Sequence, residues 1–192
     1  RTTGRNRMPD IVLETERMVL RTIGEGDAET QFRVLNTPKV MRHLGGPLEL
    51  PEIEAKHAKT AQLHAREGFS FLFGIEKASG DLIGHCGLKR VDSQGAKNPG
   101  DMEIGWLVRE DRWRQGFARE MVVAVLEWAF TRHAAPHVVA LTSEANIASW
   151  RLMERIGMRR RKDLDFDDPR FPPEDNPTIL YSLSHGEWRN RL

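Results

Sequence analysis

The stretch Trp113-Arg114-Gln115-Gly116-Phe117-Ala118-Arg119-Glu120 joins a segment typical of a strand to one typical of a helix. Gly116 lets the backbone come close to a partner, and Ala118 keeps the first helical turn unobstructed. The first N–H groups of a helix lack partners within it and lie at the positive end of its dipole. With Arg112, Arg114 and Arg119 nearby, the turn predicts an anion site that suits a pyrophosphate. The same residues also fit an ordinary turn with solvated arginines.

Regular patterns flank this turn on both sides. Residues 102–108 favour a strand, and residues 117–131 place Phe117, Met121, Val125 and Trp128 on one face of a helix. The short apolar run 138–141 predicts a strand covered on both faces. A helix over 146–156 should follow it, ended by Gly157.

The N-terminal half predicts one strand, two helices and a hairpin. The strand covers 16–23, the helices cover 28–36 and 51–67, and the hairpin strands cover 69–76 and 82–91. Asp27 is placed to cap the first helix, whereas Pro51 and Gly68 should begin and end the second. A final strand over 178–183 completes the order β, αα, βββ, α, β, α, β.

Length and composition indicate one domain. With 192 residues and 39% hydrophobic content, residues 8–192 form one core, and the patternless residues 1–7 are interpreted as a cloning remnant or frayed start. The 29 basic and 28 acidic residues give no reason to expect nucleic acid or a membrane as partner. Without an apolar run of about 20 residues or a signal-peptide pattern, we expect a cytoplasmic location.

The order of these motifs resembles the GNAT N-acyltransferase superfamily, particularly its RimJ/RimL-like branch of ribosomal-protein N-terminal acetyltransferases. The resemblance spans about residues 11–188. It includes the strand 102–108, the turn 113–120, Asn146-Ile147-Ala148-Ser149 and Arg151-Leu152-Met153-Glu154-Arg155-Ile156-Gly157-Met158. Residues 13–21 match the branch's opening strand and residues 180–183 its closing strand. Trp113, where many members have Gln or Arg, agrees with this branch.

The resemblance implies an α/β (α+β) domain. It would hold a mixed sheet of about six to seven strands, helices on both faces and a splayed pair of parallel strands. The implied reaction transfers an acetyl group from acetyl-CoA directly to a primary amine, on a protein or peptide N-terminus or a small molecule. The implied acetyl-CoA site comprises Leu107, Val108, Arg114, Gln115, Gly116, Phe117, Ala118, Arg119, Asn146 and Ser149.

Three polar residues are the implied catalytic groups. Glu103, on the strand leading to the splay, would accept the amine proton, or else make a structural hydrogen bond or face solvent. By resemblance, Asn146 orders water or backbone near the pantetheine and Ser149 assists the leaving thiolate. Asn146 could instead cap a helix and Ser149 pack as a small residue. Met153 occupies the position where many members carry a Tyr acid.

Other features support weaker hypotheses. Cys86 has no disulfide partner and is interpreted as strand packing, and the histidines show no metal-ligand spacing, so no metal is expected. The acidic residues of 163–175 either attract a cationic amine or form a solvated loop. Two other functions compete with acetyl transfer. The first is a non-catalytic acyl-CoA-binding module, and the second is a nucleic-acid-binding protein with Arg112, Arg114, Arg119 and residues 159–162 as phosphate contacts. A homodimer is also plausible.

Overall fold

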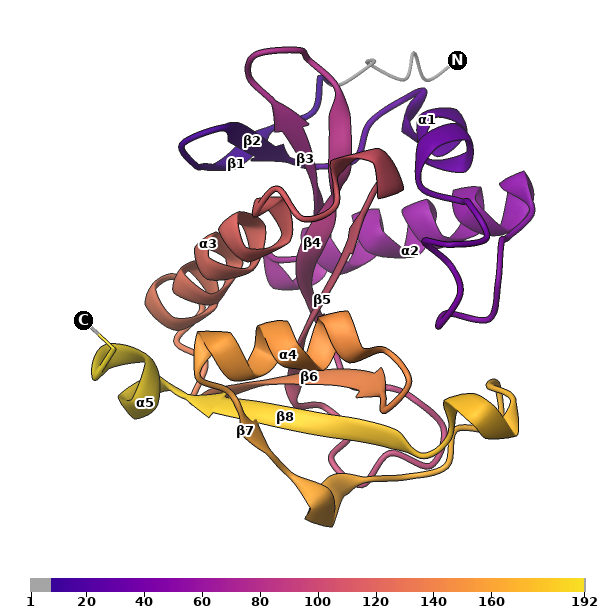
Figure 1. Ribbon diagram of the computed structural model, residues 1–192. Coiled ribbons are helices and arrows are strands. Elements are labelled where there is room, and N and C mark those ends of the chain that lie inside the picture. Colours follow the sequence, from indigo (N-terminus) through magenta and orange to yellow (C-terminus); the bar gives the residue numbers. More distant parts are fainter. Residues whose placement is uncertain (1–7, 192) are drawn as a thin grey trace.

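The computed structural model describes residues 8–191, and the interpretation of residues 1–7 lies outside this range. Its strands are β1 (Ile11–Glu14), β2 (Met18–Arg21), β3 (Phe71–Glu76), β4 (Leu82–Arg90), β5 (Met102–Val108), β6 (His137–Ser143), β7 (Arg159–Arg160) and β8 (Thr178–Ser184). Its α-helices are α1 (Asp27–Val34), α2 (Leu50–Glu67), α3 (Phe117–Thr131), α4 (Ile147–Ile156) and α5 (His185–Arg189). Figure 1 shows these elements around one central sheet.

The eight strands form one mixed sheet in the order β1-β2-β3-β4-β5-β6-β8-β7. The pair β5–β6 is parallel, whereas the other neighbouring strands run antiparallel. A parallel pair needs a crossover, and α3 provides it by carrying the chain from the end of β5 back to the start of β6. The turn at Gly116 therefore lies on the connection that leaves β5, after the short 3-10 helix Glu110–Arg112.

Helices cover both faces of the sheet, as the alternation of β3 demonstrates. The Phe73 ring contacts His57 of α2, with ring centroids 5.6 Å apart, while a Cβ on Gly74 would stand 2.8 Å from the Met121 sulfur of α3. Consecutive strand residues point to opposite faces, so α2 and α3 lie on opposite sides. Figure 1 shows the same arrangement, and the expected α/β architecture is confirmed.

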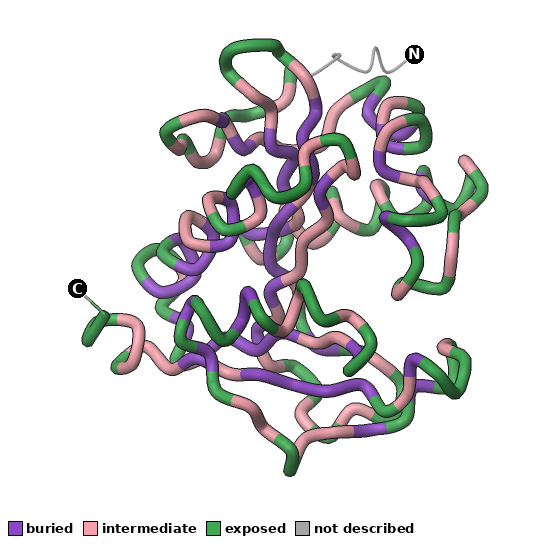
Figure 2. The backbone as a smooth tube through the Cα atoms, in the orientation of Figure 1, coloured by how far each residue is buried: buried purple, intermediate pink, exposed green. Residues whose placement is uncertain are grey.

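The core follows the α3 face of the sheet. Met121, Val122, Val125 and Leu126 are fully buried, and Figure 2 shows buried backbone running along α3 and through the middle strands. Fully burying one such side chain contributes about 1.5–3 kcal/mol, so this face dominates the stability of the fold. Cys86 belongs to this core and is fully buried, which confirms its interpretation as a packing residue.

Two details of the N-terminal region differ from expectation. The segment 13–21 is not one strand: Thr15 N–H donates to the Met18 carbonyl at 2.8 Å, and this turn separates β1 from β2. This division and the two-residue strand β7 bring the sheet to eight strands, where about six to seven were expected. Asp27 does not cap α1, because Gly26 is the N-cap residue and the Asp27 carboxylate instead binds Arg21 at 2.7 Å.

The helices that follow agree closely with the pattern. Helix α2 begins with a capping box between Glu49 and Glu52 and ends at Gly68, which has φ 79°. Helix α3 covers the expected residues 117–131, and Gly157 ends α4 with φ 100°. Within residues 8–191, no helix has the length and apolar character needed to cross a bilayer.

Candidate active site

The strands β5 and β6 separate soon after they meet. Their register contains one pair, Glu103 with Val139, whereas β4 and β5 pair from Gly84–Val108 through Arg90–Met102. Because β5 and β6 are parallel and touch near their amino ends, they diverge toward Val108 and Ser143. The expected splayed pair of parallel strands is present, and its open end lies at the carboxyl ends of both strands.

The backbone of β5 offers hydrogen-bonding groups to this opening. Arg109 N–H donates to the Ile83 carbonyl at 2.9 Å, and antiparallel strands alternate between residues that bond their neighbour and residues that do not. By this alternation, Val108 and Trp106 direct their main-chain groups away from β4, toward β6. The Leu107 carbonyl lies on the β4 side, where a Cβ on Gly84 would collide with it. Of the two expected residues, Val108 therefore has its backbone toward the opening and Leu107 does not.

An indole closes one end of the opening. Trp113 Nε1 donates to the Val108 carbonyl at 2.8 Å, although the Trp113 side chain is 44% exposed. This bond fixes the turn 113–116 against the end of β5. It also uses the Val108 carbonyl, so the Val108 N–H is the group of that residue left for a ligand.

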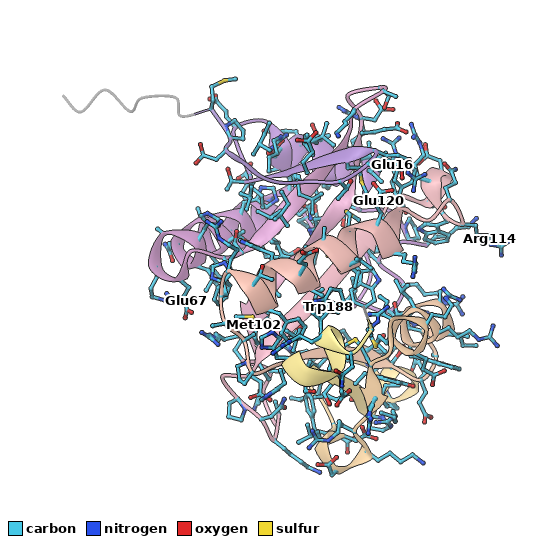
Figure 3. The ribbon with its side chains drawn as sticks, turned by 90° about the vertical axis from the view of Figure 1, so that its left-hand side faces the viewer. Glu16, Glu67, Met102, Arg114, Glu120 and Trp188 are labelled. Carbon is cyan, nitrogen blue, oxygen red and sulfur yellow. The ribbon has the colours of Figure 1, made fainter. Side chains whose placement is uncertain are left out.

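The turn after β5 has a left-handed backbone at Arg114 and Gly116. Gly116 is the N-cap of α3 with φ 81° and no side-chain capping bond, and Arg114 has φ 62°. The first intrahelical bond runs from Glu120 N–H to the Gly116 carbonyl, so the earlier N–H groups of the helix have no partner in the preceding turn. Arg114, Gln115 and Arg119 are exposed, and Figure 3 shows Arg114 extending outward at this end of α3.

A residue that the sequence did not single out, Arg17, stands beside this turn. Its Nη2 would lie 3.5 Å from a Cβ on Gly116, and its guanidinium lies 3.9 Å from the centroid of the Phe117 ring. Glu120 holds it there, because Glu120 Oε1 accepts from Arg17 Nε at 2.8 Å and Oε2 accepts from Thr15 Oγ1 at 2.6 Å. These bonds lower the pKa of Glu120 against the effect of its burial. Local sequence could not reveal Arg17, since it lies about 100 residues before the turn.

Arg112 does not serve the turn, although its position suggested that it would. Its guanidinium donates to Glu76 at 2.7 Å and to Asp81 at 2.9 Å, and these contacts raise its pKa. Both acceptors belong to the β3–β4 hairpin. Arg112 therefore ties this hairpin to the start of the turn, and the positive charge beside Gly116 comes from Arg17, Arg114 and Arg119.

Glu103 lies where β5 and β6 meet. Its Oε1 is buried and has no hydrogen-bond partner among residues 8–191, which excludes the structural hydrogen bond considered for that oxygen. Burial raises the pKa of Glu103 to about 7, and nearby Asp92 adds to this while Lys89 and Arg170 oppose it. Lys89 is the cross-strand neighbour of Glu103, but its Nζ donates to Asp92 at 2.8 Å. Glu103 thus has the pKa that a general base near neutral pH requires.

Asn146 and Ser149 begin the helix after β6. Asn146 is the N-cap of α4, as one hypothesis held, but its side chain makes no capping bond. Ser149 is half-buried one turn later, and its N–H donates to the Asn146 carbonyl at 3.2 Å. The turn at Gly116 follows the carboxyl end of β5, and α4 starts after the carboxyl end of β6. Both therefore lie at the end of the sheet where these two strands open.

Other reactive side chains are occupied or shielded. Tyr181 Oη donates to Glu154 at 2.9 Å, and burial together with this carboxylate raises the Tyr181 pKa to about 12. Burial also raises the pKa of the Cys86 thiol. Residues 8–191 contain no group of three or more His, Cys, Asp or Glu side chains arranged to hold a metal ion.

Comparisons with known proteins agree with this geometry. The sequence model of the acetyltransferase (GNAT) domain matches residues 17–159. An uncharacterized N-acetyltransferase of Bacillus subtilis (strain 168), YoaA, is 29% identical over 151 residues, covering 78% of this chain and 83% of YoaA. A crystal structure of an acetyltransferase from Agrobacterium tumefaciens str. C58 has a TM-score of 0.72 at 26% identity, covering 94% of this chain and 99% of that one.

The fold is also that of RimL, the ribosomal L7/L12 alpha-N-protein acetyltransferase, in complex with coenzyme A. That structure gives a TM-score of 0.72 at 14% identity and covers 91% of this chain and 98% of its own. The chain belongs to the GNAT acetyltransferase family. It is an acyl-CoA-dependent acyltransferase, and acetyl-CoA is the donor that the family uses.

Proposed function

We propose that the protein transfers an acetyl group from acetyl-CoA to a primary amine, as the RimJ/RimL-like branch does with protein N-termini. The observation that carries the proposal is the parallel contact of β5 and β6 at Glu103–Val139, beyond which the strands open. The opening offers main-chain groups on one side and ends at the helix N-terminus beside Gly116. Acetyl-CoA requires both features, the opening for its thioester and the helix N-terminus for its pyrophosphate.

The donor would bind through the backbone. The N–H groups at Phe117, Ala118 and Arg119 have no partner in the preceding turn, and the helix dipole favours an anion there. Gln115 and Gly116 complete the turn around it. Arg114 and Arg119 are exposed and Arg17 is adjacent, so three guanidinium groups add charge-assisted contacts. The Val108 N–H points into the opening and would stabilise the negative charge that develops on the thioester oxygen.

The side chains would manage the protons. Attack by the amine needs a neutral nitrogen, and Glu103 would accept its proton through water. The carbon–sulfur bond then breaks, and Ser149 would donate a hydrogen bond or proton to the departing thiolate. Asn146, whose side chain is free of capping, would order water beside it. A cytoplasmic location, where acetyl-CoA is made available, and a homodimer remain predictions.

Two measurements test this function separately. Calorimetry with CoA measures donor binding, and release of free thiol from acetyl-CoA with a panel of amines and N-terminal peptides measures turnover. We expect saturable CoA binding and thiol release with at least one amine, reduced by Glu103→Gln and by Ser149→Ala. CoA binding without thiol release for any amine would indicate a non-catalytic module, and no CoA binding would refute the proposal.

A further inference from the structure

A hollow of about 370 Å³ lies at the carboxyl end of β6, beside the open end of the splay. Three segments distant in sequence line it: the α1–α2 loop with Arg42 and His43, the β6–α4 turn with Ala145, and the loop before β8 with Glu174 and Asp175. Figure 1 shows the α1–α2 loop descending toward the carboxyl end of β6. Ala145 directly precedes Asn146, so this β6-end hollow adjoins the proposed thioester site.

The inner wall of the β6-end hollow is a fixed carboxylate. Asp175 is 8% exposed, and its Oδ1 lies 3.2 Å from His43 Nδ1 and 3.4 Å from Ser143 Oγ, which donates to it. Ser143 is the last residue of β6, so the sheet itself positions this carboxylate. Its Oδ2 has no hydrogen bond within the described part of the chain. A buried carboxylate with a free oxygen is a binding group for a cation.

The rim of the β6-end hollow carries one charge of each sign. Arg42 and Glu174 are exposed, and neither forms an ion pair with another residue of 8–191. Leu44 and Ile147, on the same loop and at the start of α4, are exposed apolar side chains at 44% and 47%.

We infer that the β6-end hollow binds the acceptor, and that the acceptor is a primary amine with an anionic group close to its ammonium. Asp175 and Glu174 receive the ammonium, and Arg42 receives the anionic group. This inference rests on the proposed function and specifies its substrate class. Two sources offer this chemistry: a free amino acid, and a peptide with an acidic residue near its N-terminus.

Steady-state kinetics on the full chain tests the assignment. The acceptor panel contains amino acids, their carboxamides, peptides with an acidic second residue and the same peptides with Gln there. Glu174→Gln and Asp175→Asn should each raise the KM for the acceptor about tenfold, while the KM for acetyl-CoA stays within twofold. Arg42→Gln should raise the KM only for acceptors with the anionic group. Preference for free amino acids or for acidic peptides then identifies the source.

The protein provides a matched control at the other end of β6. His137 Nε2 lies 3.0 Å from Asp101 Oδ2 beside a second hollow of about 310 Å³, so Asp101→Asn neutralises the carboxylate of a similar His–Asp contact far from the opening. Figure 3 places Met102, which lines this second hollow, at the opposite end of α3 from Arg114. Asp101→Asn should leave both KM values unchanged.

Outcomes separate this inference from the proposed function. If Glu174→Gln, Asp175→Asn and Arg42→Gln leave every acceptor KM unchanged in an active enzyme, the hollow is not the acceptor site. If no amine is acetylated, binding of the same panel is followed by NMR through the amides of Gly45 and Ala145. Absence of shifts at both amides for all compounds overturns the inference, and CoA calorimetry independently decides whether donor binding holds.

Discussion

The guanidinium of Arg17 lies 3.9 Å from the centroid of the Phe117 ring, so the β1–β2 turn packs on the first residue of α3. Glu120, one turn into α3, fixes the guanidinium by accepting from both Nε and the Arg17 main-chain N–H. The contact joins the amino end of the chain to the anion-binding turn. Glu120 and the Phe117 ring, rather than solvent, therefore set the direction of the remaining N–H groups of the Arg17 guanidinium.

Replacing Arg17 with Gln should weaken CoA binding three- to tenfold, because one charge-assisted contact at the turn is lost. Calorimetry with CoA at two salt concentrations measures this, and the difference from wild type should shrink at the higher salt. The control is Arg112→Gln, which removes the ion pairs with Glu76 and Asp81 but no charge at the turn. Equal losses of CoA affinity in both variants would show that Arg17 makes no contact of its own with CoA.

Gly116→Ala should lower CoA affinity by about tenfold. Alanine in the left-handed conformation at φ 81° costs roughly 1–2 kcal/mol. Its methyl group would also stand beside Arg17, next to the unpaired N–H groups at the start of α3. Gly26→Ala is the matched control, because Gly26 is the left-handed N-cap of α1 at φ 82° with open space around it. Both variants should lose similar thermal stability, and only Gly116→Ala should lose CoA affinity. Unchanged CoA binding would remove the turn from the site.

Activity should rise with pH through about 7, because the carboxylate form of Glu103 is the proton acceptor and burial raises its pKa to that value. Glu103→Gln should lower kcat by 10²–10⁴-fold, the usual contribution of a general base, and abolish this limb of the profile. Thiol release at saturating acetyl-CoA, with one acceptor over pH 5–9, is the measurement. A limb that persists in Glu103→Gln would assign it to the amine or to another group.

The same pKa has a consequence for stability. A carboxyl whose pKa is higher in the folded than in the unfolded state stabilises the fold below its unfolded value of 4.5. That contribution disappears as pH rises toward about 7. The free energy of unfolding of the wild type should therefore fall relative to Glu103→Gln between pH 4.5 and 7, as urea titrations can measure. A constant difference across this range would contradict the burial of the carboxylate.

Cys86 should resist alkylation in the folded protein. Its side chain is fully buried and burial raises the pKa of its thiol, so little thiolate exists and no reagent reaches it. Iodoacetamide labelling followed by mass spectrometry should be slow in buffer and complete in urea. Rapid labelling of the native protein would contradict this and would show that β4 opens locally. The activity of the labelled protein would then show whether the opening between β5 and β6 is disturbed.

The sequence by itself determined most of the elements, because hydrophobic period and turn residues are local properties. Residues 102–108 and 117–131 formed the strand and helix that their patterns predicted, and Gly116 adopted the conformation that glycine favours. Thr15 and Arg17 lie within residues 13–21, which the resemblance matched to one opening strand, whereas a turn divides this segment into β1 and β2. The turn depends on the Thr15–Met18 bond and on Glu120, which distant packing supplies.

Only the tertiary structure decided which polar residues lie together. The strand pattern of 102–108 places a carboxylate at Glu103 but carries no information on its burial, which comes from neighbours on other strands and loops. Likewise, Arg112 was expected beside the anion-binding turn, but Arg17 lies there instead. Each guanidinium is held by the carboxylates that folding brings near it, which are Glu76 and Asp81 for Arg112 and Glu120 for Arg17. His43, Ser143 and Asp175 are separated by up to 132 residues and meet through β6 and two loops. Periodicity fixes an element's type, but pairing of charges requires the positions of all elements at once.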